Sequence, residues 1–96
     1  MAVMLTATLG RIAYGNHVET WYNLPMSKVV QNSIDRGIDG EYWERKDGCK
    51  MFGKYVILAS DESIPIGTVI ETSRGLGIVL DRHTTTPEVV DLAVTW

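Results

Sequence analysis

The chain has 96 residues and a net charge of −3, and 45% of its residues are hydrophobic. A chain of this length forms one modest hydrophobic core, so we expect a single domain over residues 1–96. The acidic balance, without a cluster of Lys and Arg, argues against nucleic acid as a partner, because phosphate binding needs grouped cations.

The sequence also bears on membranes, disulfides and metals. No stretch approaches the roughly 20 apolar residues of a membrane span, and the opening MAVMLTATLGRIAYG lacks the early positive charge of a signal peptide. Cys49 is the only cysteine, which excludes an internal disulfide and a CxxC metal site. We therefore expect no membrane insertion, no signal peptide, no metal and no other cofactor.

Short strands and one helix are predicted in the first half of the chain. Val3–Leu9 alternates in the manner of a strand, and Val18–Tyr22 is a second extended segment. The segment PMSKVVQNSIDRG then carries apolar residues at helical spacing. It predicts a short helix over residues 27–35, with Ser27 as N-cap and Gly37 just past its end.

The second half reads as a hairpin followed by further short strands. Asp47-Gly48 is a turn pair that tolerates positive φ, between strands at 42–43 and 51–52. The remaining predicted strands are Tyr55–Ala59, Thr68–Thr72, Leu76–Leu80 and Val89–Val94. Six or seven short strands in fewer than 100 residues favour a small closed β-barrel over a sandwich.

Three aspartates end or interrupt the apolar runs of this second half. Asp61 follows YVILAS, Asp81 follows GIVL, and Asp91 divides EVVDLAV. Such a residue either contributes to a carboxylate site where strands end or hydrogen-bonds the amides of its own loop, and both alternatives stay open for each of the three.

From Tyr55 to Trp96 the chain resembles the double-psi β-barrels that act on cell-wall glycan. It is similar to the three-aspartate (3D) domain of Gram-positive bacteria, whose pattern is an Asp, IPLGT, GYG, DTGG and IDL. Asp81-Arg82 and Val90–Leu92 are also similar to the DRG and IDL of the rare lipoprotein A branch. The matching positions of the 3D pattern are Asp61, Ile64–Thr68, Gly75–Gly77, Asp81 and Asp91-Leu92.

The resemblance implies a six- or seven-stranded double-psi β-barrel with lytic transglycosylase activity. Such enzymes cut the MurNAc–GlcNAc bond of peptidoglycan, and the sugar's own 6-hydroxyl attacks to leave a 1,6-anhydro end. Asp91 matches the acid–base residue of the membrane-bound lytic transglycosylase A family, and Asp81 matches an essential carboxylate of the rare lipoprotein A branch. Asp61 completes the catalytic set, and we expect it mainly to hold the Pro65–Gly67 loop. Carboxylates that share a groove raise one another's pKa, so that one can stay protonated near neutral pH.

Substrate binding is assigned to three residues. Thr20 and Tyr22 lie in TWY, which looks like the TAY that opens these barrels, and a tyrosine ring can stack on a sugar. His83 lies two positions past Asp81 and would share its face if the strand continues, although a loop histidine without a role is the simpler alternative. Glu19 is a further candidate acid, facing Asp81 across the barrel.

The match to the 3D domain is incomplete, and other functions remain open. RHTTTPEV stands where the Gly-Gly after the second aspartate is found in that domain. Its loss favours a non-catalytic, expansin-like glycan-binding barrel, whereas retention of three aspartates favours an enzyme. A structural module of a phage particle or secretion apparatus is a third possibility. The resemblance implies peptidoglycan glycan strands as the partner and an extracellular or cell-wall location.

Overall fold

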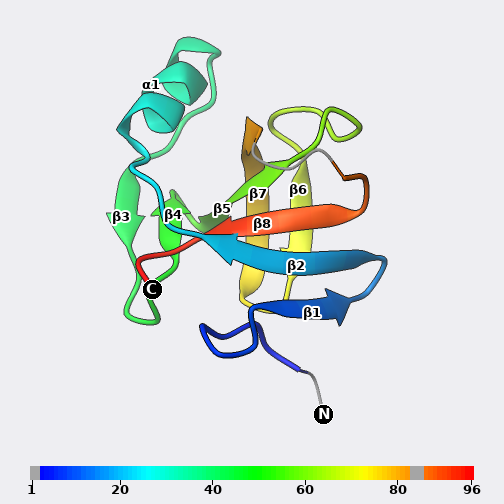
Figure 1. Cartoon of the computed structure of the whole chain (residues 1–96). Coiled ribbons are helices and arrows are strands. Elements are labelled where there is room, and N and C mark those ends of the chain that lie inside the picture. The colour runs from blue at the N-terminus through cyan, green and yellow to red at the C-terminus, as the bar shows by residue number, and fades with distance from the viewer. Residues whose placement is uncertain (1–2, 83–85) are drawn as a thin grey trace.

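Strands make up most of the regular structure in the computed structural model, which describes residues 3–82 and 86–96 (Figure 1). The described residues form eight strands, β1 (Arg11–Tyr14), β2 (His17–Tyr22), β3 (Tyr42–Glu44), β4 (Lys50–Phe52), β5 (Tyr55–Ser60), β6 (Val69–Thr72), β7 (Gly75–Arg82) and β8 (Val89–Ala93), and one helix, α1 (Ser27–Asp35). The mainly β class with one short helix is confirmed, and so is the β3–β4 hairpin.

The expected strand number, six or seven, is wrong, and so is the first predicted strand. Residues 3–9 form no strand, because two of their amides bond to side chains instead of a neighbouring strand. Leu5 N–H donates to Ser73 Oγ at 3.0 Å, and Leu9 N–H donates to Thr6 Oγ1 at 2.9 Å. The strand lies later in the chain, as β1, which pairs antiparallel with β2.

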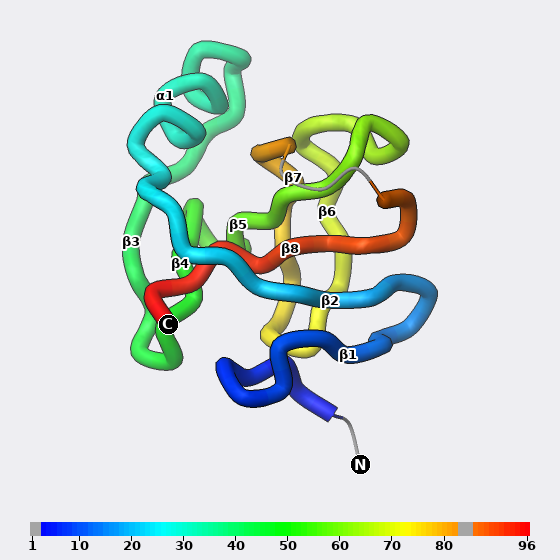
Figure 2. The backbone as a smooth tube through the Cα atoms, in the orientation of Figure 1, coloured from blue at the N-terminus to red at the C-terminus, as the bar shows by residue number. Residues whose placement is uncertain are grey.

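The strands form one hydrogen-bonded sheet in which β5 is central. Along the sheet the order is β1-β2-β8-β5-β4-β3, and β7 pairs with both β5 and β6. Two of the pairings are parallel, β2 with β8 and β5 with β7. Figure 2 shows β2 and β8 running side by side although they come from opposite halves of the chain. Strand neighbours are therefore set by long-range pairing rather than by sequence order.

Buried side chains fall into two clusters because successive residues of a strand point to opposite faces. The first contains Leu58, Val79 and Leu92, among others. The second, here the helix-side cluster, has Val29 and Val30 of α1 packed against it, and its members are Tyr22, Met26, Phe52, Ile57, Ala59, Ile78, Leu80 and Ala93. The apolar stripe of α1 thus covers one part of the sheet, as its spacing predicted.

The start of α1 differs from the prediction. Met26, not Ser27, occupies the N-cap position, and no side chain caps the helix there. Met26 is buried in the helix-side cluster, and its carbonyl accepts the Val30 amide at 2.8 Å, so core packing sets the start of the helix one residue earlier. Gly37 follows the end of the helix, as predicted. In the part of the chain that the structure describes, no helix has the length and apolarity to cross a membrane.

Candidate functional site

Asp81 and Asp91 lie on either side of β5 and share one pairing partner, Ala59. In the antiparallel β5–β8 ladder Ala59 pairs with Asp91, and in the parallel β5–β7 ladder it pairs with Asp81. Paired residues in a ladder point to the same face of a sheet. The two carboxylates therefore flank one small buried side chain on the face that carries the helix-side cluster.

A β-bulge aims Asp81 at this face. The β5–β7 register shifts by one residue between Leu58 and Ala59. Val79 pairs before the shift and Asp81 after it, so Leu80 is the extra residue. In an unbroken strand Asp81 would point to the face of Val79, because a one-residue change of register reverses every side chain. The bulge instead brings Asp81 to the face of Ala59.

Two side chains of β2 hold the carboxylates. Thr20 pairs with Asp91 in the β2–β8 ladder, and its hydroxyl donates a hydrogen bond to Asp91 Oδ1. The Tyr22 hydroxyl, two positions along the same strand, donates to Asp81 Oδ2 at 3.0 Å. The other oxygen of Asp81 accepts the Arg82 amide at 2.8 Å. Side chains of one strand, β2, thus position both aspartates on the face of the sheet that the two share.

The electrostatics at Tyr22 show that both carboxylates act on one phenol. Burial is the main cause that raises the pKa of Tyr22 far above its ordinary value, followed by the charge and hydrogen bond of Asp81 and then the charge of Asp91. Tyr22 accordingly stays protonated at any physiological pH. Its chemical role is that of a neutral hydrogen-bond donor, not a base or nucleophile.

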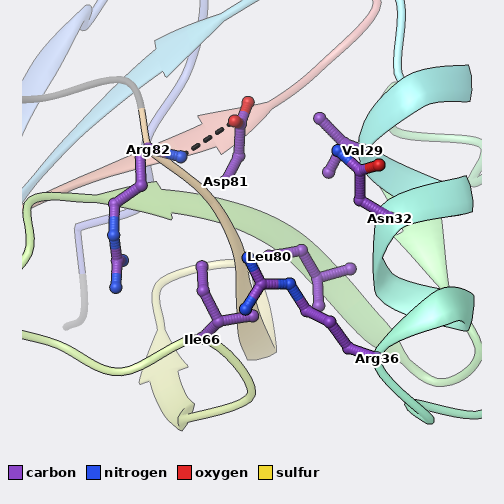
Figure 3. Close-up of a pocket in the computed structure, with 7 residues that line it drawn as sticks. All are labelled: Val29, Asn32, Arg36, Ile66, Leu80, Asp81 and Arg82. Carbon is purple, nitrogen blue, oxygen red and sulfur yellow. Dashed lines mark hydrogen bonds between the residues drawn. The ribbon is translucent and has the colours of Figure 1, made fainter.

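Asp81 opens onto a groove of about 330 Å³ (Figure 3). The groove lies between α1, the loop after β5 and the end of β7, and its lining residues are Val29, Asn32, Arg36, Ile66, Leu80, Asp81 and Arg82. Asp91 is not part of this lining and is only 7% exposed. Of the two paired carboxylates, Asp81 is therefore the one that a ligand in the groove reaches directly.

The other candidate acids have separate contacts. Asp61 Oδ1 accepts the Ser63 amide at 3.1 Å and the Ser63 hydroxyl at 2.5 Å, so it stabilises the loop that it begins. Glu19 is fully buried and points to the opposite face from Thr20; it accepts bonds from the Ser73 amide and hydroxyl at 2.9 and 2.6 Å. The described contacts of both residues thus lead away from the Asp81–Asp91 pair. His83 lies outside the described residues.

The part of the groove that α1 contributes was not predicted from the sequence. Val29, Asn32 and Arg36 recur at intervals of three and four residues, which places them on one side of a helix. That periodicity was available, but nothing local indicated that this side faces Asp81. The aromatic side chains also differ in exposure: Tyr22 is 6% exposed, whereas Tyr42 and Trp43 of β3 are 38% and 44% exposed. The Tyr22 ring is therefore too buried to stack on a sugar, and the exposed rings lie on β3.

Neither metal-binding side chains nor comparisons with known proteins identify this site. No group of three or more His, Cys, Asp or Glu side chains within residues 3–82 and 86–96 could hold a metal ion. Comparison of the chain with protein-family models, with curated proteins and with solved structures gave no significant match.

Proposed function

We propose that this protein is a lytic transglycosylase-like enzyme that cuts the MurNAc–GlcNAc bond of peptidoglycan and leaves 1,6-anhydro-MurNAc ends. The observation that carries this proposal is the convergence of Asp81 and Asp91 on Ala59, beside a groove onto which Asp81 opens. Residues from three strands, β2, β7 and β8, are needed to build it. Capping of a local loop would not require residues from three strands around two carboxylates that flank one residue.

The transglycosylase reaction requires little more than such a pair of carboxylates. A carboxylic acid donates its proton to the glycosidic oxygen as the bond to the anomeric carbon breaks. The 6-hydroxyl of the same sugar then forms the new bond to that carbon, and the carboxylate takes up the hydroxyl proton. The nucleophile is already tethered, so no water has to be positioned. The second carboxylate, on the other side of Ala59, favours positive charge developing at the sugar ring.

The two aspartates divide these roles. The resemblance gives acid–base chemistry to Asp91, while the groove geometry gives Asp81 the direct approach to a ligand. Thr20 and Tyr22 fix the orientation of the pair through their hydroxyls. Asp61 supports the neighbouring loop through Ser63. His83, two positions past Asp81 in the sequence, is proposed as a substrate contact.

A double-psi β-barrel is the architecture that we propose for this site. The two parallel pairings, β2 with β8 and β5 with β7, support it, because barrels of this kind interleave strands from both halves of a chain. Glu19 of β2 accepts hydrogen bonds from the amide and hydroxyl of Ser73, in the turn between β6 and β7, and these bonds support closure of the sheet. A crystal structure would test this proposal, which expects β1 and β6 to lie side by side where the sheet closes.

Digestion of purified sacculi tests the activity. The parent protein should release 1,6-anhydro-muropeptides, detected by mass spectrometry. Asp81→Asn and Asp91→Asn keep side-chain size but remove the proton-carrying group, so each should lower the rate by about 10²–10⁴-fold. Asp61→Asn should have a smaller effect, because its amide oxygen can still accept the Ser63 amide. Exposed Asp39→Asn is the matched control and should cleave at the parent rate.

The burial of Asp91 favours a second candidate, a non-catalytic glycan-binding barrel. A residue 7% exposed has little direct access to a bound sugar. Under this alternative the parent protein sediments with insoluble sacculi but releases no anhydro-muropeptide, and Asp91→Asn changes stability rather than turnover. This alternative is ruled out if the parent protein releases anhydro ends and the Asp91→Asn variant does not.

A further inference from the structure

The groove at Asp81 contains a guanidinium group that the site described above does not use. Arg36 follows the last residue of α1 and is exposed, and it lines the same groove as Asp81. Figure 3 shows its side chain reaching from α1 across the groove toward Leu80 and Ile66, whereas the Asp81 carboxylate points away from it. The two charged groups thus lie at separate places in one groove.

Arg36 has no carboxylate partner within the described residues. The ion pairs found there join His17 to Glu19, and Arg45 and Arg74 to Asp47. Residues 83–85, which lie outside the described residues, are His-Thr-Thr and include no acidic residue. Within the part of the chain that the structure describes, the Arg36 guanidinium thus forms no ion pair with a carboxylate.

The other polar groups of the lining strengthen the positive character of the groove. Arg82 donates to a neutral acceptor, Ser60 Oγ, at 3.0 Å. Asn32, one turn of α1 before Arg36, also lines the groove and can donate or accept. Asp81 is the only acidic residue among the lining side chains, so the lining contains two guanidinium groups and one carboxylate. This local excess of positive charge occurs in a chain whose net charge is −3.

We propose that Arg36 determines substrate specificity by binding a carboxylate carried by the glycan, while Asp81 faces the bond to be cut. This inference rests on the proposed function and adds to it a residue, Arg36, that would distinguish an acidic from a neutral amino-sugar polymer. A guanidinium matches a carboxylate with two parallel hydrogen bonds, which a lysine cannot reproduce. The carboxylate belongs either to the lactyl group of the sugar or to an attached peptide.

A purely structural role for Arg36 predicts something different. A positive charge at the C-terminal end of a helix stabilises the helix dipole, and a lysine serves that purpose equally well. Arg36→Lys keeps this effect and loses bidentate recognition, whereas Arg36→Gln loses both. A structural role would change the free energy of unfolding and the binding of all glycans alike. A specificity role changes the ratio between acidic and neutral glycans.

Binding measurements on three soluble probes separate these roles. The probes are a chitin oligosaccharide, which is neutral, a peptide-free glycan with free lactyl carboxylates, and a peptide-bearing glycan. ¹⁵N NMR titration gives affinities for the parent protein, for both Arg36 variants and for Lys28→Gln, an exposed cation of α1 outside the groove lining, as control. Arg36→Gln should weaken binding of an acidic glycan by about fivefold or more, in line with an exposed charge-assisted contact, and leave chitin binding unchanged. Loss with the peptide-free glycan identifies the lactyl carboxylate, and loss with the peptide-bearing glycan alone identifies the peptide.

The inference and the proposed function fail in different ways. If the parent protein cleaves sacculi but Arg36→Gln binds every probe as the parent does, or weakens all three equally, the specificity role is wrong and the enzyme assignment stands. If the parent protein binds none of the probes and releases no anhydro-muropeptide, the proposed function is wrong and this inference falls with it.

Discussion

Tyr22 and Asp81 are 59 positions apart in the chain, yet the Tyr22 hydroxyl donates a 3.0 Å hydrogen bond to Asp81 Oδ2. The contact depends on two long-range arrangements. The parallel β2–β8 pairing brings β2 next to β8, and the bulge in the β5–β7 ladder turns Asp81 toward the face that Tyr22 occupies. Neither residue could meet the other if either pairing were shifted by one position.

Tyr22→Phe should destabilise the protein by about 1 kcal/mol, because it removes a buried donor from a carboxylate while keeping the ring in the core. The change is read from the midpoint of urea denaturation. Tyr14→Phe is the matched control: its hydroxyl also bonds to a carboxylate, Glu71, at 3.2 Å, but at an exposed position, and its loss should be close to zero. Equal effects of the two variants would show that burial of the Tyr22–Asp81 bond adds nothing.

Gly48→Ala should destabilise the protein more than Gly37→Ala, although both glycines have φ near +90°. An added Cβ at Gly37 meets nothing within 4 Å, so only the backbone penalty of about 1–2 kcal/mol applies. At Gly48 the same atom would lie 2.5 Å from Trp96 Nε1, whose N–H donates to the Asp47 carbonyl at 2.8 Å. Displacing this ring adds about 1–3 kcal/mol of overpacking. Thermal unfolding of both variants measures the difference, and indistinguishable midpoints would contradict it.

The Asp47 carboxylate should make the free energy of unfolding depend on pH in the acidic range. Hydrogen bonds from Arg45, and further ones from Cys49, hold the pKa of Asp47 well below its ordinary value. A lowered pKa in the folded state means that the stabilisation is present above about pH 4, the ordinary value, and is lost as the pH falls toward the folded-state pKa.

Asp47→Asn should therefore be less stable than the parent protein at pH 7, by no more than about 1 kcal/mol because the ion pairs are partly exposed. The difference should shrink between about pH 4 and pH 2. Urea denaturation at a series of pH values measures it, with the exposed Asp39→Asn as the reference for a carboxylate outside this network. A difference that stays constant down to pH 2 would mean that the lost hydrogen bonds, not the charge, account for it.

Cys49 should be nearly inert toward thiol reagents in the native protein. Its side chain is fully buried, and burial, followed by the charge of Asp47, raises its pKa to about 11. Only the thiolate reacts, so at pH 8 an aromatic disulfide reagent should label the native protein about 10²-fold more slowly than the same protein in denaturant. Comparable rates in the two states would show that the β3–β4 turn opens readily.

Local sequence patterns determined most of the secondary structure. The 27–35 helix, the Asp47-Gly48 hairpin and the strands from Tyr55 onward follow from the spacing of apolar residues and from turn residues, which act over a few positions only. The prediction was wrong for Val3–Leu9, because those amides are satisfied by side chains such as Ser73, which is far away in the sequence. It was wrong for Ser27 because the burial of Met26 is likewise a tertiary effect.

For the candidate site, the sequence by itself identified the aspartates, since carboxylates at the ends of apolar runs are conspicuous. It also pointed to Thr20 and Tyr22, but as substrate-binding residues and not as the side chains that bond to Asp91 and Asp81. Only the tertiary structure decided which of them meet. Asp81 reaches Tyr22 because a single extra residue, Leu80, reverses the face of the strand beyond it, and no local pattern marks such a bulge. Arg36 joins Asp81 at the groove because α1 packs over that same face, which depends on how the whole sheet is assembled rather than on any segment of it.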